Sequence, residues 1–211
     1  MARITEFNEG GVRGFLHWPG QPTGEGLVIT HGAGSNCGAP LLMEASEAGC
    51  TAGITVLRCD LPFRQRKAFG PPTPALATAD RAGLRNAVAT LRSLVRGPIF
   101  LGGHSYGGRQ ASILASEEQG VASALLLLSY PLHPPAKPAQ LRTEHFLALR
   151  IPALFVHGTR DTFATPAELA LALTAITAPT RCIAIEGVGH ELGRGRIHFA
   201  ALWEQLRQWT T

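Results

Sequence analysis

The sequence lacks a hydrophobic run long enough to cross a membrane. A transmembrane helix needs about 18 to 20 consecutive apolar residues, and every apolar run in this 211-residue chain is shorter. The opening stretch, MARITEFNEGG, also lacks the apolar core and small-residue cleavage site of a secretory signal. We therefore expect a cytoplasmic protein that does not bind membranes.

Cysteine is scarce and widely spaced. The chain has 4 cysteines, Cys37, Cys50, Cys59 and Cys182, and no C-x-x-C pair. Disulfide scaffolds and zinc sites both need closely arranged cysteines. The sequence therefore predicts reduced, mostly buried thiols, no metal site and no disulfide framework.

Charge is also sparse, and no run of one sign occurs. Charged residues make up 16% of the chain, and the formal net charge of +4 comes from arginines scattered along it. Nucleic-acid binding surfaces usually show clustered basic residues. The composition, 45% hydrophobic without repeats, predicts one globular domain over residues 1–211 and no nucleic-acid partner.

Short apolar runs alternate with helical patterns along the chain. Runs typical of strands buried on both faces cover 26–30, 53–59, 98–103, 124–130, 152–158 and 181–187. Amphipathic helical patterns cover 75–94, 109–118, 166–174 and 197–209. This alternation predicts an α/β fold with a mostly parallel sheet and helices on both faces. Residues 3–7 and 11–18 flank a turn, NEGG, and predict an antiparallel hairpin at the sheet edge.

Polar side chains follow several of the predicted strands. Ligands of open α/β sheets bind beyond the carboxyl ends of the strands. The residues at or just after these ends are His31, Asp60, Ser105, Tyr130, Asp161 and His190.

Ser105 lies in a G-x-S-x-G pattern directly after a predicted strand. In a sharp strand-to-helix turn a nucleophile has a strained backbone, and side chains two residues away on either side would collide with neighbouring elements. Gly103 and Gly107 remove those collisions. The same turn would direct the N–H of Tyr106 at a developing oxyanion. The pattern predicts a catalytic serine, although an ordinary glycine-rich loop would also fit it.

A catalytic serine needs a base and a group that orients that base. His190 lies in a glycine-flanked loop after the last predicted strand, and Asp161 follows the preceding one. Asp161 could instead cap the helix near Pro166, a role that Thr165 could also fill. The chain order serine, aspartate, histidine is the one expected for a triad at such a turn.

These motifs together resemble an α/β-hydrolase, and the resemblance extends from VITHGAGSN to the C-terminal helix. The stretches DLPFRQ, FGPPTP and SYPLHPPAKPAQLRTEH resemble the small dienelactone-hydrolase-like group, which includes a testis-expressed protein and a subunit of a histone-acetyltransferase complex. Dienelactone hydrolases proper use a cysteine nucleophile. Because this chain has a serine, their substrate does not carry over.

A different interpretation of residues 26–60 is a dinucleotide-binding unit. Gly32, Gly34 and Gly38 would contact a pyrophosphate and Asp60 a ribose. The G-x-G-x-x-x-G spacing and the late position of Asp60 argue against it. In the hydrolase interpretation, the N–H of Ala33 in the same loop supplies a second oxyanion donor.

The sequence thus predicts a serine hydrolase, most simply a carboxylesterase, that cleaves small-molecule esters and needs no cofactor. Thioesters and lactones are close alternatives, and a non-catalytic interaction module is the alternative from another class. His31, His104 and Arg64 are candidate substrate-binding residues, although Asp60 and Arg64 could simply pair with each other.

The segment 131–150 is too short to form a cap domain. It is rich in proline and basic residues, with Phe146, Leu147 and Leu149 as the expected apolar anchor. We therefore expect a small, open and partly polar pocket. Arg64, together with nearby Arg66 and Lys67, could add positive charge at its rim.

Overall fold

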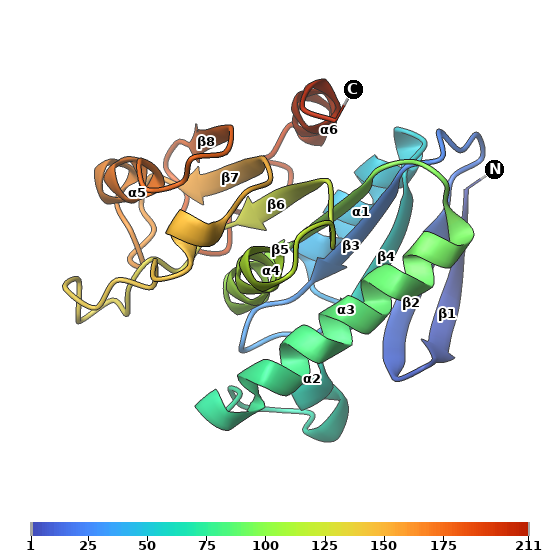
Figure 1. Ribbon diagram of the computed structural model, residues 1–211, viewed down its shortest axis with the longest axis horizontal. Helices are drawn as coiled ribbons and strands as arrows, with labels where there is room; N and C mark the ends of the chain where they lie inside the picture. The colour runs from blue at the N-terminus through green and yellow to red at the C-terminus, as the bar shows by residue number, and fades with distance from the viewer. Residues whose placement is uncertain (1, 211) are drawn as a thin grey trace.

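One eight-stranded sheet runs through the computed structural model, which describes residues 2–210 (Figure 1). The strands are β1 (Arg3–Glu9), β2 (Val12–Trp18), β3 (Gly26–Thr30), β4 (Thr55–Asp60), β5 (Ile99–His104), β6 (Ala124–Leu128), β7 (Ala153–Gly158) and β8 (Thr180–Ile185). Their order across the sheet is β1-β2-β4-β3-β5-β6-β7-β8. Strands β3 to β8 are parallel, whereas β1 and β2 form an antiparallel hairpin joined to β4. The predicted fold class is confirmed.

Six α-helices and two short 3₁₀ turns connect the strands. The helices are α1 (Pro40–Thr51), α2 (Pro62–Arg66), α3 (Ala77–Leu94), α4 (Tyr106–Glu117), α5 (Pro166–Leu173) and α6 (Phe199–Gln208). The 3₁₀ turns are η1 (Pro74–Leu76) and η2 (Phe146–Ala148). Over residues 2–210, none of the helices combines the length and apolar character that a membrane crossing requires.

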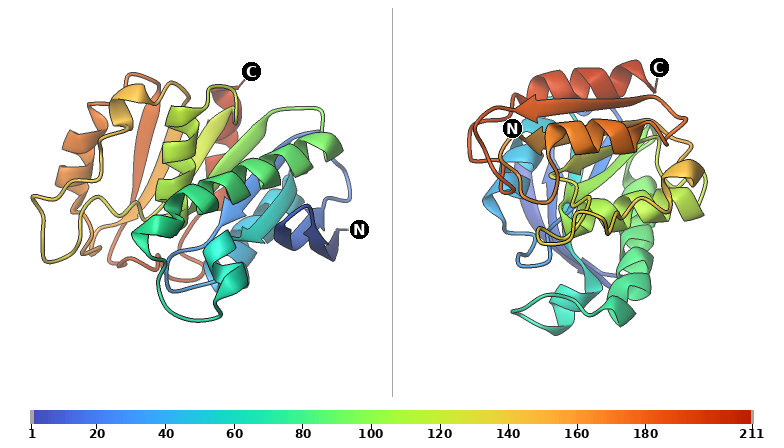
Figure 2. Two further views of the ribbon diagram at one scale, coloured as in Figure 1. Left: turned by 60° about the horizontal axis from the view of Figure 1, so that its bottom comes forward. Right: turned by 90° about the vertical axis from the view of Figure 1, so that its left-hand side faces the viewer.

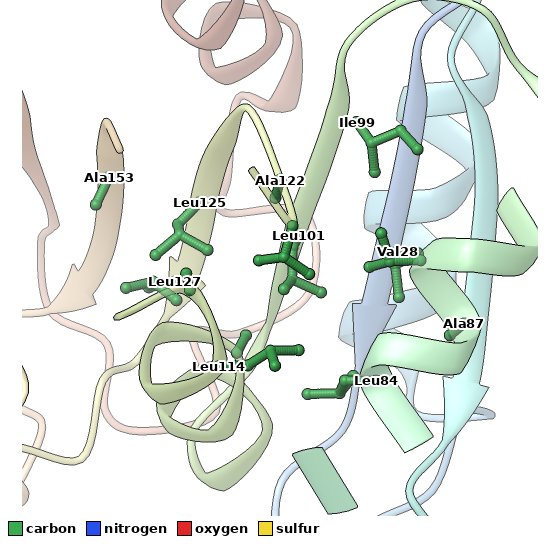
Figure 3. Close-up of a cluster of buried hydrophobic side chains, with 14 of the residues drawn as sticks. Val28, Leu84, Ala87, Ile99, Leu101, Leu114, Ala122, Leu125, Leu127 and Ala153 are labelled. Atoms are coloured by element: carbon green, nitrogen blue, oxygen red, sulfur yellow. The ribbon is translucent and has the colours of Figure 1, made fainter. Parts of the chain in front are cut away.

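The core forms two layers because the buried strands alternate their side chains between the two faces of the sheet. Val28, Leu101 and Leu125 point toward α3 and α4, as Figure 3 shows, whereas Leu27 and Phe100 point toward α1 and α6. Helices α3 and α4 lie side by side on their face, visible at the front of the left view in Figure 2. Both faces of the central strands are therefore covered, which explains why most of their residues are apolar.

Several details differ from the sequence predictions. Strand β6 ends at Leu128, and Ser129 turns the chain with a φ of 49°. Strand β8 lies at the edge of the sheet and is only partly buried, so it is not covered fully on both faces. Helix α4 begins at Tyr106, three residues before the predicted start at 109, because its first turn contains two glycines that hide the helical pattern.

The segment 131–150 forms a loop and the turn η2, drawn in yellow to orange at the left of Figure 1. Phe146 and Leu149 are fully buried and anchor it as predicted. Leu147, in contrast, is 67% exposed, because the 3₁₀ turn directs it away from the core. The expectation for Leu147 was wrong.

Candidate active site

The carboxyl ends of the parallel strands bring Ser105, Asp161 and His190 together. Nε2 of His190 lies 2.8 Å from Oγ of Ser105, and Nδ1 of His190 lies 2.8 Å from Oδ2 of Asp161. A carboxylate only accepts hydrogen bonds, so Nδ1 carries the proton and Nε2 of the neutral ring accepts from the serine hydroxyl. This is the arrangement that a serine needs to lose its proton to a base.

The backbone at Ser105 is strained, and its neighbours must be glycines. Ser105 has a φ of 50° and a ψ of −117° between β5 and α4. A Cβ on Gly107 would lie 2.5 Å from the carbonyl oxygen of His31. A Cβ on Gly103 would lie 2.8 Å from backbone atoms of Gly107 and Gly108. The glycines thus allow the close packing that places Ser105 at the carboxyl ends of the parallel strands.

Asp161 is a buried carboxylate held in its charged form. Its side chain is 0% exposed, and Oδ1 accepts a 2.8 Å hydrogen bond from the N–H of Phe163. Burial alone would raise the pKa of Asp161, but the hydrogen bonds from His190 and from Phe163 N–H outweigh it and bring the pKa below its ordinary value. Thr165 caps α5 in a capping box with Glu168, so Asp161 does not serve as that cap.

Two neighbours fix the position of His190. The ring of Phe163 packs against the imidazole, with the ring centroids 4.2 Å apart. On the other side, Nε2 of His104 lies 2.9 Å from the carbonyl oxygen of His190 and donates to it. Burial lowers the pKa of His104, which keeps that ring neutral. His104 therefore positions the loop of His190, and it lines a separate cavity of about 240 Å³ rather than the one beside Ser105.

Two backbone N–H groups are free to bind an oxyanion next to Ser105. Ala33 and Tyr106 both line the cavity that contains Ser105. Within residues 2–210, neither of their N–H groups donates to a protein acceptor. The Tyr106 hydroxyl donates to Oδ2 of the buried Asp80 at 2.7 Å, which holds the start of α4 in place.

Arg64 binds the backbone of loops next to the site and does not line the cavity beside Ser105. Its side chain is buried and donates to the carbonyl oxygens of Ala33, Ser35, Lys67 and Gly70. Four hydrogen bonds use most of the donors of the guanidinium group. Arg64 thus fixes the loop that carries the N–H of Ala33, and it does not line the cavity beside Ser105.

His31 likewise has a supporting position. It is 0% exposed. Its Nδ1 donates to the carbonyl oxygen of Gly32 at 2.9 Å, and its Nε2 accepts from the N–H of Leu61 at 3.1 Å. Because backbone groups occupy both ring nitrogens, His31 cannot bind a substrate at Ser105. The sequence interpretation of His31 and Arg64 as substrate contacts is replaced by this structural role.

Asp60 is also occupied within the protein. It pairs with Arg13 at 2.7 Å, and its Oδ1 accepts from the N–H of Cys37 at 2.7 Å. The expected Asp60–Arg64 pair was therefore wrong, and the Asp60 carboxylate is not free to bind a ribose. Helix α1 begins only at Pro40, well after β3, whereas a pyrophosphate site needs a tight turn into the helix. The dinucleotide interpretation does not fit.

A cavity of about 520 Å³ opens beside Ser105. Its lining includes residues that the sequence interpretation missed, namely Pro71, Pro72, Pro74, Arg81, Arg109, Gln110, Ile113, Pro131, Arg142 and Phe163. Arg109 could have been identified, because it follows Ser105 by four residues on one helix and so lies one turn away on the same face. The others come from distant loops, and no local pattern marks them.

Comparison with known proteins gives the family. Residues 23–207 match the family described as alpha/beta hydrolase domain. A dienelactone hydrolase from Anabaena variabilis is 19% identical, with a TM-score of 0.72 over 99% of this chain and 96% of that one. Est1E from Butyrivibrio proteoclasticus, solved with ferulic acid bound, is 16% identical, with a TM-score of 0.70 over 99% and 94%.

An esterase domain from a Rhodothermus marinus protein has the same fold, with 20% identity and a TM-score of 0.67 over 99% of this chain and 97% of that one. At these identities the solved structures support the fold alone. The family match covers most of the chain, including all three residues that meet at the carboxyl ends of the strands. The chain therefore belongs to the alpha/beta hydrolase domain family, and its fold resembles that of dienelactone hydrolase.

Proposed function

We propose that this protein is a serine hydrolase that cleaves small carboxylic esters, with thioesters and lactones as related substrates. The observation that carries the proposal is the pair of 2.8 Å contacts that join Ser105, His190 and Asp161 at the mouth of a cavity. The match of residues 23–207 to an alpha/beta hydrolase domain supports the reaction class. One protein of similar fold is named as an esterase domain and another as a dienelactone hydrolase.

The reaction begins with acyl transfer to the serine. Oγ of Ser105 attacks the carbonyl carbon of the ester while its proton passes to Nε2 of His190. The ionised Asp161 stabilises the imidazolium that forms. The negative charge on the former carbonyl oxygen is bound by the N–H groups of Ala33 and Tyr106. His190 then returns the proton to the leaving alcohol, and the C–O bond breaks.

Water completes the cycle. His190 takes a proton from a water molecule, whose oxygen attacks the acyl carbon of the ester on Ser105. The second tetrahedral intermediate collapses, and the proton on His190 passes to Oγ of Ser105. The products are a carboxylic acid and the regenerated serine, so the cycle balances without a redox partner.

Hydrolysis of p-nitrophenyl acetate by the wild type and by Ser105→Ala tests the proposal. We expect the substitution to lower kcat by a factor on the order of 10³ or more, because no nucleophile replaces the hydroxyl. Circular dichroism checks that the variant is folded. A folded Ser105→Ala variant with more than about a tenth of the wild-type rate would contradict the proposal. A wild type without any esterase activity would favour the interaction module.

A further inference from the structure

The cavity beside Ser105 is lined by cationic groups and by no acidic one. Three arginines, Arg81, Arg109 and Arg142, contribute to its wall, and no aspartate or glutamate does. Arg81 is satisfied within the protein, because Nε lies 2.9 Å from a carboxylate oxygen of Glu117 and Nη1 lies 3.2 Å from Oε1 of Gln110. The other two arginines lack such partners.

Arg109 presents a guanidinium group with no acceptor. It lies one turn beyond Ser105 on α4, and its own N–H donates to the carbonyl oxygen of Ser105 at 3.0 Å. Within residues 2–210 its side chain makes no hydrogen bond or ion pair, and its Nε is buried. A buried donor of a charged group without an acceptor is costly. An acceptor that the protein does not supply would remove this cost.

Arg142 approaches the same cavity from the segment 131–150. Its side chain is half-buried and makes a single long hydrogen bond, 3.3 Å to the carbonyl oxygen of Pro131. Burial lowers the pKa of Arg142, and the nearby positive charge of Arg109 lowers it further. The positive charges of Arg109 and Arg142 therefore line the same cavity. Neither forms an ion pair with a carboxylate of the described chain.

The surrounding polar groups compensate for these two charges only in part. Nε2 of Gln110, a third donor in the cavity wall, is buried without an acceptor. His145 contacts Oγ of Ser112 at 2.8 Å, and burial with the charge of Arg109 lowers its pKa to about 4, so it adds no charge near neutral pH. Glu144 is exposed, and its negative charge raises the pKa of Arg142, but it forms no ion pair with either arginine in the described chain. The wall of the cavity beside Ser105 thus has several side-chain hydrogen-bond donors without acceptors in the described part of the protein.

From this arrangement, and resting on the proposed function, we infer that the substrate is an ester that carries a carboxylate. The guanidinium groups of Arg109 and Arg142 would bind that carboxylate, because planar guanidinium groups match its two oxygens. Arg109 lies four residues after Ser105, a rise of about 6 Å along a helix. The carboxylate is therefore expected about two to four carbon atoms from the scissile carbonyl, as in monoesters of short dicarboxylic acids.

A matched pair of substrates tests this inference. p-Nitrophenyl hydrogen succinate carries a free carboxylate, and its methyl ester, p-nitrophenyl methyl succinate, has the same chain with the charge removed. We expect kcat/KM of the wild type to favour the acid by about tenfold or more. In Arg109→Gln and in Arg142→Gln this preference should fall by about tenfold. A second pair, 4-acetoxybenzoate and methyl 4-acetoxybenzoate, places the charge on the alcohol side instead.

Arg96→Gln is the charge-matched control. Arg96 is exposed and precedes β5, at the end of the sheet opposite Ser105, so the wild-type preference should persist. If the wild type prefers the neutral ester in both pairs, the inference is overturned. The same conclusion follows if Arg96→Gln and Arg109→Gln reduce the preference equally, because a general charge effect then explains it.

Binding to Ser105→Ala separates this inference from the proposed function. We expect monomethyl glutarate to bind this variant about tenfold more tightly than dimethyl glutarate, as measured by ligand-observed NMR, and Arg109→Gln in the same background to abolish the difference. Equal binding of the two ligands would overturn the anion site even if esters are hydrolysed. A retained difference in a protein without esterase activity would support the site and reject only the proposed reaction.

Discussion

Ser105 has a backbone conformation that only close glycine packing makes possible. Its φ of 50° places the chain in the left-handed region, where a residue with a side chain is strained. The strain is maintained because α4 packs directly against the loop after β3, with Gly107 next to the carbonyl oxygen of His31. The position of the hydroxyl therefore depends on residues that perform no chemistry.

We predict that Gly107→Ala destabilises the protein and removes the esterase activity that we propose. The new Cβ would lie 2.5 Å from backbone, so α4 must shift and Ser105 would move away from His190. The expected loss of unfolding free energy is about 1–3 kcal/mol, measured by urea denaturation. Gly34→Ala is the control, because its Cβ meets nothing within 4 Å and its stability should change by less than about 0.5 kcal/mol. Equal stability of the two variants would refute the steric argument.

Asp161→Asn should preserve the fold and lower kcat by a factor on the order of 10⁴. An asparagine amide can donate to Nδ1, which favours the tautomer whose Nε2 carries the proton and cannot accept from Ser105. Steady-state kinetics on p-nitrophenyl acetate measure the effect. A loss below about tenfold would mean that Asp161 does not orient His190.

At the scale of elements, an ion pair joins the start of β3 to α6. Nε of Arg207 lies 2.9 Å from Oε1 of Glu25, and the side chain of Glu25 is only 11% exposed. Burial would raise the pKa of Glu25, but the hydrogen bonds from Arg207 and Thr23 outweigh it and leave the pKa below its ordinary value. The charged form thus stabilises the attachment of the last helix.

Glu25→Gln should therefore reduce the free energy of unfolding by about 1–2 kcal/mol at neutral pH. A group with a lowered folded-state pKa stabilises above its unfolded pKa and loses this contribution as the pH falls through the folded value. The difference between the wild type and Glu25→Gln should therefore be fully present above the ordinary glutamate pKa of about 4.3 and should shrink as the pH falls below it. Glu118→Gln, which breaks an exposed pair with Arg85, should cost less than about 1 kcal/mol. A difference for Glu25→Gln that is constant from neutral to acid pH would contradict this account.

The segment 131–150 forms part of the wall of the cavity beside Ser105, and we expect it to limit the size of the substrate. It contributes Pro131 and Arg142 to the wall of the cavity of about 520 Å³, and Arg81 and Arg109 lie in the same wall, so the cavity is partly polar. We predict that p-nitrophenyl esters with acyl chains of about two to four carbons are hydrolysed far faster than esters of twelve or more. Initial rates across the series, below the micelle concentration of the long esters, measure this. A maximum at the long chains would refute it.

At the scale of the whole molecule, the fold was largely predictable because most residues of the central strands are apolar. Their two faces are covered, so the boundaries of β3, β5 and β7 follow from the sequence to within about one residue. The order of the strands across the sheet could not be predicted from the sequence, because it depends on contacts between segments that are distant in the chain. The exposure of β8 and the short helix α2 were missed for the same reason.

The candidate site was predictable where a residue follows a strand end, as Ser105 and Asp161 do. The orientations of His31 and Arg64 were not, because a sequence does not show whether a side chain points into a cavity or under a loop. Arg109 was not recognised as a cavity residue, because the glycines in the first turn of α4 obscure the helical pattern that connects it to Ser105. The roles of Ser105, His190, Asp161, Ala33 and Tyr106 in catalysis remain predictions that experiments must test.

The most direct test of the account is covalent labelling of the folded protein by a fluorophosphonate probe, followed by intact mass measurement and peptide mapping. A serine activated by its histidine attacks such a probe without any need for the natural substrate. We predict one adduct per chain, on Ser105, and no adduct on folded Ser105→Ala. Absence of labelling in the folded wild type, or an adduct on the Ser105→Ala variant, would contradict the account.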